Sequence, residues 1–313
     1  MTCPYLALHL ETISPVSEKT HLLSPVSHNY HEKAWPLVVQ PEVQEEHQEL
    51  CVLRETATET IAYAGAPLAI LLQFLKPGIA AGTCRHSRFD KHPGSRLRRT
   101  VTYLNAVIYG SPADKAAVSG MVNKQHSFIR GAGYSAHDFE LQRWTAATIY
   151  VANVRVWETF IGPMPAEKKE ALCADMAVVA TSLKMPAEMW PQTLDDFETY
   201  WETTLEETVP TEQSRQAAAA FLYGLTLPWF LFWMPFLLRV FMTNWLPEKA
   251  RRAYGLPDPS TWWVWLTYNV VVCLVSSVYA LVPRSAKMWA HELMLSDMRQ
   301  SADDIRRTGR WLV

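Results

Sequence analysis

Apolar residues recur at helical spacing along most of the chain, but only after an opening segment that has no sustained period. Up to about residue 45 the sequence is rich in Pro, Ser, His and Thr, so we expect a loosely ordered N-terminal arm. Charged and apolar residues then interleave over 45–64, and an apolar run over 66–74 is closed by Lys76-Pro77-Gly78. These patterns predict two helices separated by a break.

Further helices are predicted wherever turn-forming residues bound a helical pattern. They cover 96–109, 138–160, 167–183 and 195–205, the last with Thr193 as a candidate N-cap. Alternation between residues 150 and 156 would also fit a strand, but its flanks are helical and we expect a helix. No internal repeat or low-complexity linker divides the chain after residue 45. The sequence therefore predicts an all-α fold, with an arm over 1–45 and a single large multi-helix domain over 46–313.

One predicted helix has a well-defined start. Ser111 can act as its N-cap, Pro112 fits the first helical position, and Asp114 is placed to complete a capping box. We expect this helix to continue until Gly131 and Gly133 interrupt it.

His126 lies on the apolar stripe of that helix, at spacings of three and four residues from Val118, Val122 and Ile129. A neutral imidazole in apolar surroundings can offer a lone pair to iron or zinc, while its second nitrogen needs a hydrogen-bond partner. Buried polar groups usually find ordinary partners, however. On this pattern alone, we expect a core histidine with satisfied hydrogen bonds rather than a metal ligand.

Two long stretches without charged residues, 217–238 and 262–282, are long enough to cross a membrane. Pro228 and Pro235 interrupt the first, and Thr, Asn and Ser residues interrupt the second. Because a large helical core needs central helices that are apolar all round, we interpret both as buried core helices. The basic residues that follow them could equally contact a lipid surface or cap helix ends, and true spans stay open as an alternative.

Composition excludes some classes of function. The chain has 313 residues, 49% hydrophobic content and 13 Trp, enough to bury a large core. A net charge of −2 and the lack of a nucleic-acid-reading motif argue against nucleic acid as a partner. Five scattered cysteines without a CxxC pair indicate a reducing compartment. With no signal peptide in the first fifty residues, we expect an intracellular protein.

Several short motifs occur in a fixed order. They are Leu68-Ala-Ile-Leu-Leu-Gln-Phe-Leu-Lys-Pro-Gly78, His86-Ser-Arg-Phe89, Arg96-Leu-Arg-Arg-Thr100, His126-Ser-Phe-Ile-Arg-Gly131 and Tyr134-Ser-Ala-His-Asp138. In this order and at these spacings the chain resembles the family that joins fungal ER-bound oxygenases of the mycophenolic-acid type to the bacterial rubber oxygenase, or latex clearing protein. Weaker likeness continues through Pro191-Gln-Thr-Leu194 and Val282-Pro-Arg284, so that it covers roughly residues 50 to 300.

This resemblance implies a haem pocket enclosed by the helices, with a non-covalent haem b whose iron is bound by His126. It therefore reverses the expectation of an ordinary core histidine. It also implies that Arg96 and Thr100 lie near the haem. An i, i+4 spacing places both side chains on one helix face, where a guanidinium and a hydroxyl can hold the propionates. Without the resemblance, the basic segment 96–99 would be interpreted as a solvated turn that pairs with local carboxylates.

Departures from the family pattern limit what the resemblance implies about chemistry. Where the rubber-cleaving enzyme has a lysine that can ligate iron, this chain has Arg99, which stays protonated and cannot be a ligand. The glutamate used as a base in rubber cleavage has no counterpart, since no Glu occurs between Glu59 and Glu140. Rubber is therefore not expected as a substrate. His86 could supply a polar group on the distal side of the haem, or it could be a surface or helix-capping residue.

The function expected from these observations is that of a haem-dependent oxygenase or oxidoreductase of secondary metabolism. Its partners would be O2, an electron donor and a terpenoid, prenylated or polyketide-like small molecule oxidised at or beside a C=C bond. The expected location is the cytoplasm or the cytoplasmic face of an internal membrane.

Two other functions stay open. A non-haem iron enzyme could use His126, His137 and Asp138, because two imidazoles and a carboxylate form a facial triad. Adjacent residues point in different directions on a regular element, which argues against this triad. Alternatively, a catalytically silent membrane-associated protein could use the Trp-rich stretches to dock onto a partner.

Overall fold

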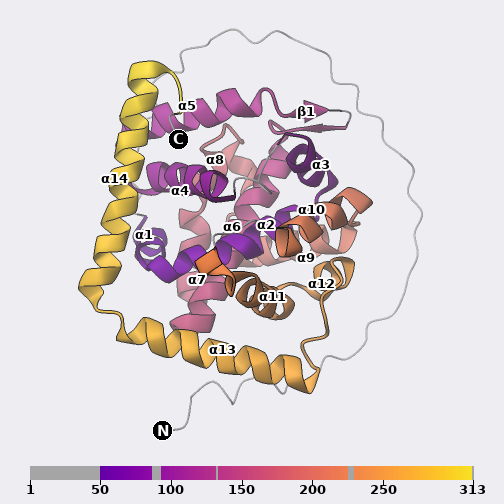
Figure 1. The fold of residues 1–313 in the computed structure, drawn as a ribbon. Helices are drawn as coiled ribbons and strands as arrows, with labels where there is room; N and C mark the ends of the chain where they lie inside the picture. The colour runs from indigo at the N-terminus through magenta and orange to yellow at the C-terminus, as the bar shows by residue number, and fades with distance from the viewer. Residues whose placement is uncertain (1–49, 87–92, 132, 225–228, 312–313) are drawn as a thin grey trace. The chain divides into compact units, whose positions relative to one another are not determined.

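The computed structural model describes residues 50–86, 93–131, 133–224 and 229–311, and almost all of these are helical or in helix connections (Figure 1). Residues 49–313 form one compact unit. The prediction of an all-α fold is thus confirmed for the described part of the chain. The predicted arm, 1–45, lies outside it.

The first four helical elements follow one another from residue 51 to residue 86. They are α1 (Cys51–Thr58), the 3-10 helix η2 (Thr60–Gly65), α2 (Ala66–Gln73) and α3 (Pro77–His86), and α2 and α3 contribute to the core. The sequence Lys76-Pro77-Gly78 was expected only to end a helix, but Pro77 also begins α3, at 107° to the segment before it. Proline fits the first helical position because its fixed φ is helical and no partner is needed there for the missing N–H.

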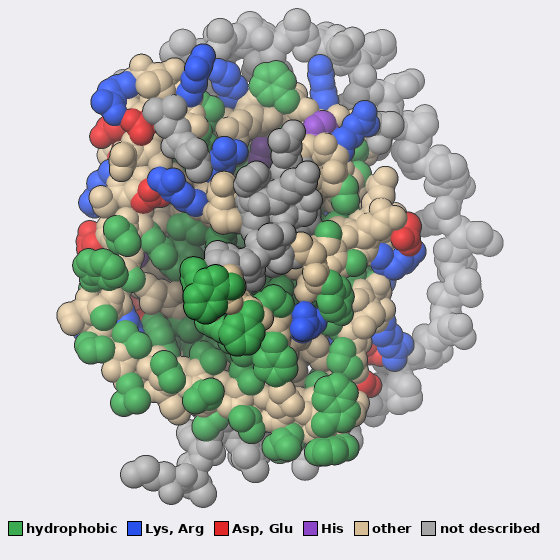
Figure 2. All heavy atoms as spheres, viewed as in Figure 1, with side chains coloured by type: hydrophobic (Ala, Val, Ile, Leu, Met, Phe, Trp, Pro, Cys, Tyr) green, Lys and Arg blue, Asp and Glu red, His purple; other side chains and the backbone are tan. Residues whose placement is uncertain are grey.

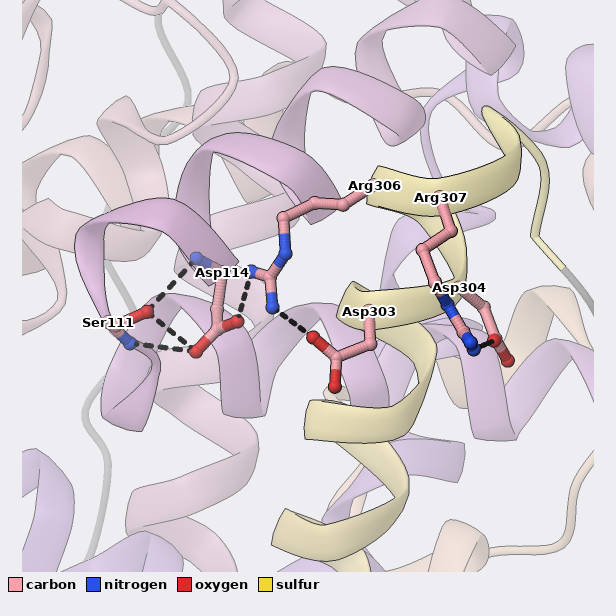
Figure 3. Close-up of polar contacts among 6 residues, drawn as sticks. All are labelled: Ser111, Asp114, Asp303, Asp304, Arg306 and Arg307. Atoms are coloured by element: carbon pink, nitrogen blue, oxygen red, sulfur yellow. Dashed lines mark hydrogen bonds and ion pairs between the residues drawn. The ribbon is translucent and has the colours of Figure 1, made fainter.

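The helices α4 (Pro93–Tyr109) and α5 (Pro112–His126) follow as a neighbouring pair. The predicted capping box of α5 is confirmed, because Asp114 N–H donates to Ser111 Oγ and the Ser111 N–H donates to the Asp114 carboxylate, both at 3.2 Å (Figure 3). The helix ends at His126, before the glycines expected to stop it. A short antiparallel hairpin of β1 (Arg130–Gly131) and β2 (Tyr134–Ser135), which was not predicted, comes next.

The long helix α6 (Phe139–Phe160) runs through the core with Asp138 as its N-cap, so the predicted helix is confirmed and the strand alternative is wrong. Trp144 of α6 is fully buried; its indole N–H donates to the Leu72 carbonyl at 3.1 Å, and its ring stacks on Trp201 at 4.8 Å. Trp144 thereby links three parts of the chain that are far apart in sequence.

Shorter helices surround α6. The predicted helix 167–183 is broken at Met176 into α7 (Ala166–Asp175) and α8 (Ala177–Thr181). After the 3-10 turn η3 (Ala187–Met189), the helix α9 (Leu194–Glu207) starts at the expected N-cap, Thr193.

The interpretation of the two uncharged stretches as buried core helices is largely wrong. The first is divided among α10 (Glu212–Tyr223), the 3-10 turn η4 (Trp229–Leu231) and α11 (Met234–Trp245), with a proline in the first turn of α11. The second forms one helix, α13 (Trp262–Leu281), but only 17% of its most apolar window is buried. Length and hydropathy do not distinguish a core helix from one that is held on the surface of the domain.

Two further helices complete the fold, α12 (Glu248–Ala253) and α14 (Arg284–Thr308). In Figure 1, α14 runs beside α4 and α5, and α13 lies along another edge. Arg306 of α14 donates to Asp114 at 2.6 Å and also pairs with Asp303, which ties the start of α5 to α14 (Figure 3). The α4–α5 pair, which carries most of the predicted site residues, is thereby held against α14.

Candidate functional site

His126 is the last residue of α5, and its imidazole is half-buried. Its Nδ1 atom is buried without a hydrogen-bond partner. Burial lowers the pKa of His126 to about 4, with smaller contributions from nearby His137 and Arg96. The ring is therefore neutral at neutral pH, and one of its nitrogens carries a free lone pair, which is the state that metal ligation requires.

The α4–α5 pair brings Arg96 close enough to His126 to act on its pKa. Arg96 is half-buried near the start of α4, where burial lowers its own pKa. Its guanidinium can form paired hydrogen bonds with a carboxylate such as a haem propionate. The structure thus brings together the predicted iron ligand and a predicted propionate partner.

Thr100 and Arg99 lie on the same helix as Arg96. Both are exposed on α4, and the Thr100 hydroxyl donates to the Arg96 carbonyl at 3.1 Å. Their neighbour Arg98 donates to both carboxylate oxygens of Asp297 on α14, at 3.0 and 3.1 Å from Nε. Arg98 therefore pairs with a carboxylate, as the alternative interpretation expected, but the basic segment is part of a helix rather than a turn and the partner lies on another helix.

His86 ends α3 and contacts the hairpin. Its Nε2 lies 3.3 Å from the hydroxyl of Tyr134 on β2. Tyr134 packs closely on glycines of two elements, since a Cβ at Gly131 would lie 2.6 Å from its ring and one at Gly78 would lie 3.1 Å from its Cβ. Tyr134 lies in one of the ordered motifs, but no role was predicted for it. The structure makes it the partner of His86.

The non-haem triad is not formed. The rings of His126 and His137 are 6.5 Å apart, and His137 Nε2 lies 3.3 Å from the Asn123 carbonyl. The carboxylate of Asp138 accepts the Glu140 N–H at 2.9 Å as the N-cap of α6, so it serves the helix rather than a metal. No group of three or more His, Cys, Asp or Glu side chains among the described residues could hold a metal ion. The hypothesis of a non-haem iron site at these residues is therefore wrong.

A cavity of about 450 Å³ lies away from the predicted residues, lined mainly by residues of α9 and of the segment 188–192, together with Arg143 of α6. Arg143 and Tyr200 form part of its wall, with the guanidinium 3.8 Å from the ring centre. It contains neither His126 nor Arg96, so the predicted enclosing haem pocket is not this cavity. At His126, a haem would thus be held through the donor atoms of the side chains around it. Residues 87–92, which join His86 to α4, lie outside the described part of the chain.

The structure also contains a buried histidine that was not predicted from the sequence. His291 of α14 is 3% exposed, its Nδ1 has no partner, and its ring lies 5.0 Å from that of Tyr109. Asn105, one turn before Tyr109 on α4, has a buried amide nitrogen without a partner. The missed signal was the helical spacing of His291 with Leu295 and Met298. His291 is therefore a second candidate iron ligand, with which His126 must be compared experimentally.

Comparison with known proteins supports the motif-based resemblance. Residues 53–276 match the model of the family described as ER-bound oxygenase mpaB/B'/Rubber oxygenase, catalytic domain. The uncharacterized proteins Mb2261 of Mycobacterium bovis and Rv2237 of Mycobacterium tuberculosis are each 26% identical over 264 residues, covering 76% of this chain and 96% of the relative. No solved structure matches the chain significantly. The matched region contains His126 but not His291, and since it spans most of the chain, the protein belongs to the ER-bound oxygenase and rubber oxygenase catalytic-domain family.

Proposed function

We propose that the protein is a haem b-dependent oxygenase in which His126 is the iron ligand. The observation that carries this proposal is a half-buried, neutral imidazole with an unpartnered buried nitrogen beside a guanidinium. A single imidazole suffices for a haem, because the porphyrin supplies four nitrogens. The family match gives oxygenase chemistry as the class of reaction.

The residues around His126 have separate roles in this proposal. Neutral His126 would hold the iron, and Arg96 would pair with a propionate, with Thr100 one turn further along the same helix. The His86–Tyr134 pair offers a hydroxyl and an imidazole that can donate or accept a proton near the site. When bound, haem would supply the activation of O2. Arg99 is exposed and would act only through its charge.

We propose a hydrophobic substrate, terpenoid, prenylated or polyketide-like, oxidised at or beside a C=C bond, with O2 and an electron donor as further partners. The proposed setting is secondary metabolism at the cytoplasmic face of an internal membrane. Support comes from the description of family members as ER-bound and from the large apolar side chains that the described surface leaves exposed.

The absorption spectrum of the purified protein with haem tests the proposal. We expect a Soret band at one haem per chain, and oxygen-dependent conversion of a prenylated or terpenoid alkene in the presence of a reductant. A Soret band without conversion of any such substrate would contradict the substrate class. Absence of a Soret band after haem addition would contradict the cofactor and favour the catalytically silent docking protein, which the exposed aromatic residues would also suit.

A further inference from the structure

Large apolar side chains remain exposed in a stripe along the whole of α13. They are between 47 and 82% exposed and recur every three or four residues: Trp262, Leu266, Val270, Leu274, Val278 and Leu281. The opposite side of the helix is buried through Val264, Val271 and Val272. An isolated exposed apolar residue needs no explanation, but a continuous stripe of this length indicates an interaction surface.

The stripe continues onto η4 and the start of α11. There Trp229 is 85% and Phe232 is 78% exposed, and Phe230 and Phe236 are about half exposed. In Figure 2, hydrophobic side chains gather over the region where Figure 1 places η4, α11 and α13. We call this surface, formed by the exposed residues of η4, α11 and α13, the aromatic face.

The helix α13 is fixed along the domain and is not free to cross a bilayer on its own. Trp245 Nε1 donates to the hydroxyl of Tyr268 at 3.0 Å, and the hydroxyl of Tyr279 donates to Glu59 of the segment before η2. These anchors are eleven residues apart, which is about 16 Å along a helix. Since α13 is held at two points along its length, we expect its stripe to enter only the surface layer of a membrane.

The charged residues in the segments that form the aromatic face indicate what kind of partner surface the face would bind. No Asp or Glu occurs in 213–247 or in 259–291, whereas Arg239 and Arg284 lie within these segments. Lys287 also lies there, but it pairs with Glu59. Tryptophan, which contributes much of the face, is the residue enriched at membrane–water interfaces. A second copy of the chain presenting the same face would bring like charges together. Anionic headgroups over an apolar layer match both features.

We propose that the aromatic face docks the domain flat on a bilayer that contains anionic lipids. The surface lies on elements other than α4, α5 and the hairpin, so docking does not depend on the proposed haem site. Such docking would keep the domain at the membrane, where hydrophobic molecules concentrate.

Flotation with vesicles tests this proposal on the full chain. We expect the protein to float with vesicles of an equal mixture of phosphatidylcholine and phosphatidylserine, and to float less with phosphatidylcholine alone or at high salt. The combined variant Trp229→Ser, Trp262→Ser and Leu266→Ser should bind at least about tenfold more weakly, since three apolar side chains no longer enter the lipid. The matched control is Phe128→Ser, a 71% exposed residue after α5 that should bind like the parent.

Three results would overturn the proposal. They are no flotation of the parent, equal binding of the triple variant, and a lipid-free dimer that the triple variant dissociates, which would make the face a contact between copies. Circular dichroism checks that the variants fold. Independently of any variant, lipids brominated near the headgroup should quench the tryptophan fluorescence of the bound parent protein, and binding without quenching would also contradict the docking.

Discussion

At the scale of single residues, the electrostatic state of His126 decides what the site can do. Burial, together with nearby His137 and Arg96, lowers the pKa of His126 to about 4. A histidine with an ordinary pKa would have to lose a proton before binding iron at slightly acidic pH. His126 has already lost it, so it is prepared to act as a ligand over a wider pH range.

This lowered pKa predicts how haem binding depends on pH. Because the unliganded imidazole is neutral well below pH 6.5, protons should not compete for it between about pH 8 and pH 5. Haem affinity, measured by titration of the Soret band, should therefore stay constant over this range and fall only as the pH approaches 4. A loss of affinity centred near pH 6.5 would show that the ligand is a histidine with an unperturbed pKa.

Some residues of the candidate site could be predicted from the sequence and others could not, and the difference has a physical reason. His126, Arg96 and His86 belong to short motifs in a fixed order, so they could be found without a structure. Tyr134 and His291 owe their positions to contacts between distant segments, His86 with β2 and Tyr109 with α14. Helical spacing alone indicates that a residue is buried, but it does not indicate which residue lies opposite.

At the scale of elements, the sequence correctly predicted helix starts where the capping hydrogen bonds form within one helix. The capping box at Ser111 and the N-cap Thr193 lie where the sequence placed them, because each forms its hydrogen bonds within its own first turn. The hairpin after α5 was missed, since its strands have only two residues each and leave no alternating pattern. The break at Met176 was missed because no Gly or Pro marks it in the sequence.

The hairpin gives a prediction at this scale. In Gly131→Ala the added Cβ would lie 2.6 Å from the ring of Tyr134, so the ring must shift and lose its contact with His86. We expect a loss of about 1 to 3 kcal/mol in the free energy of unfolding, measured with urea.

The matched control is Gly120→Ala, within α5, where an added Cβ meets no atom within 4 Å. Alanine there should stabilise the protein by about 0.5 to 1 kcal/mol, because glycine is the poorer helix former. If both substitutions have the same effect, then Tyr134 is not packed against Gly131 as described.

At the scale of the whole molecule, the fold class followed from the sequence, but the placement of its most apolar helix did not. Hydropathy suggested that 262–282 is a core helix, whereas α13 buries only Val264, Val271 and Val272. Burial is decided by which helices pack together, and the core is already filled by residues of α2, α6, α10 and α11. The apolar side of α13 is thus available for contacts outside the domain.

The two proposed activities use separate parts of the molecule. Haem binding depends on α4, α5 and the hairpin, whereas membrane docking depends on η4, α11 and α13. Substitutions on the aromatic face should therefore leave haem content unchanged, and loss of haem should leave flotation unchanged. If haem binding fails, the membrane-docking proposal is not affected, and if flotation fails, the haem proposal is not affected.

The central claim is that His126, rather than another histidine, holds the haem. It is tested most directly by comparing the haem content of His126→Ala with that of His291→Ala and the parent, each purified with haem present and measured by the Soret band and by a pyridine assay. His126→Ala should lose the haem, while His291→Ala, which removes the more deeply buried imidazole outside the family match, should retain it. Full haem occupancy in His126→Ala, or loss confined to His291→Ala, would contradict the account.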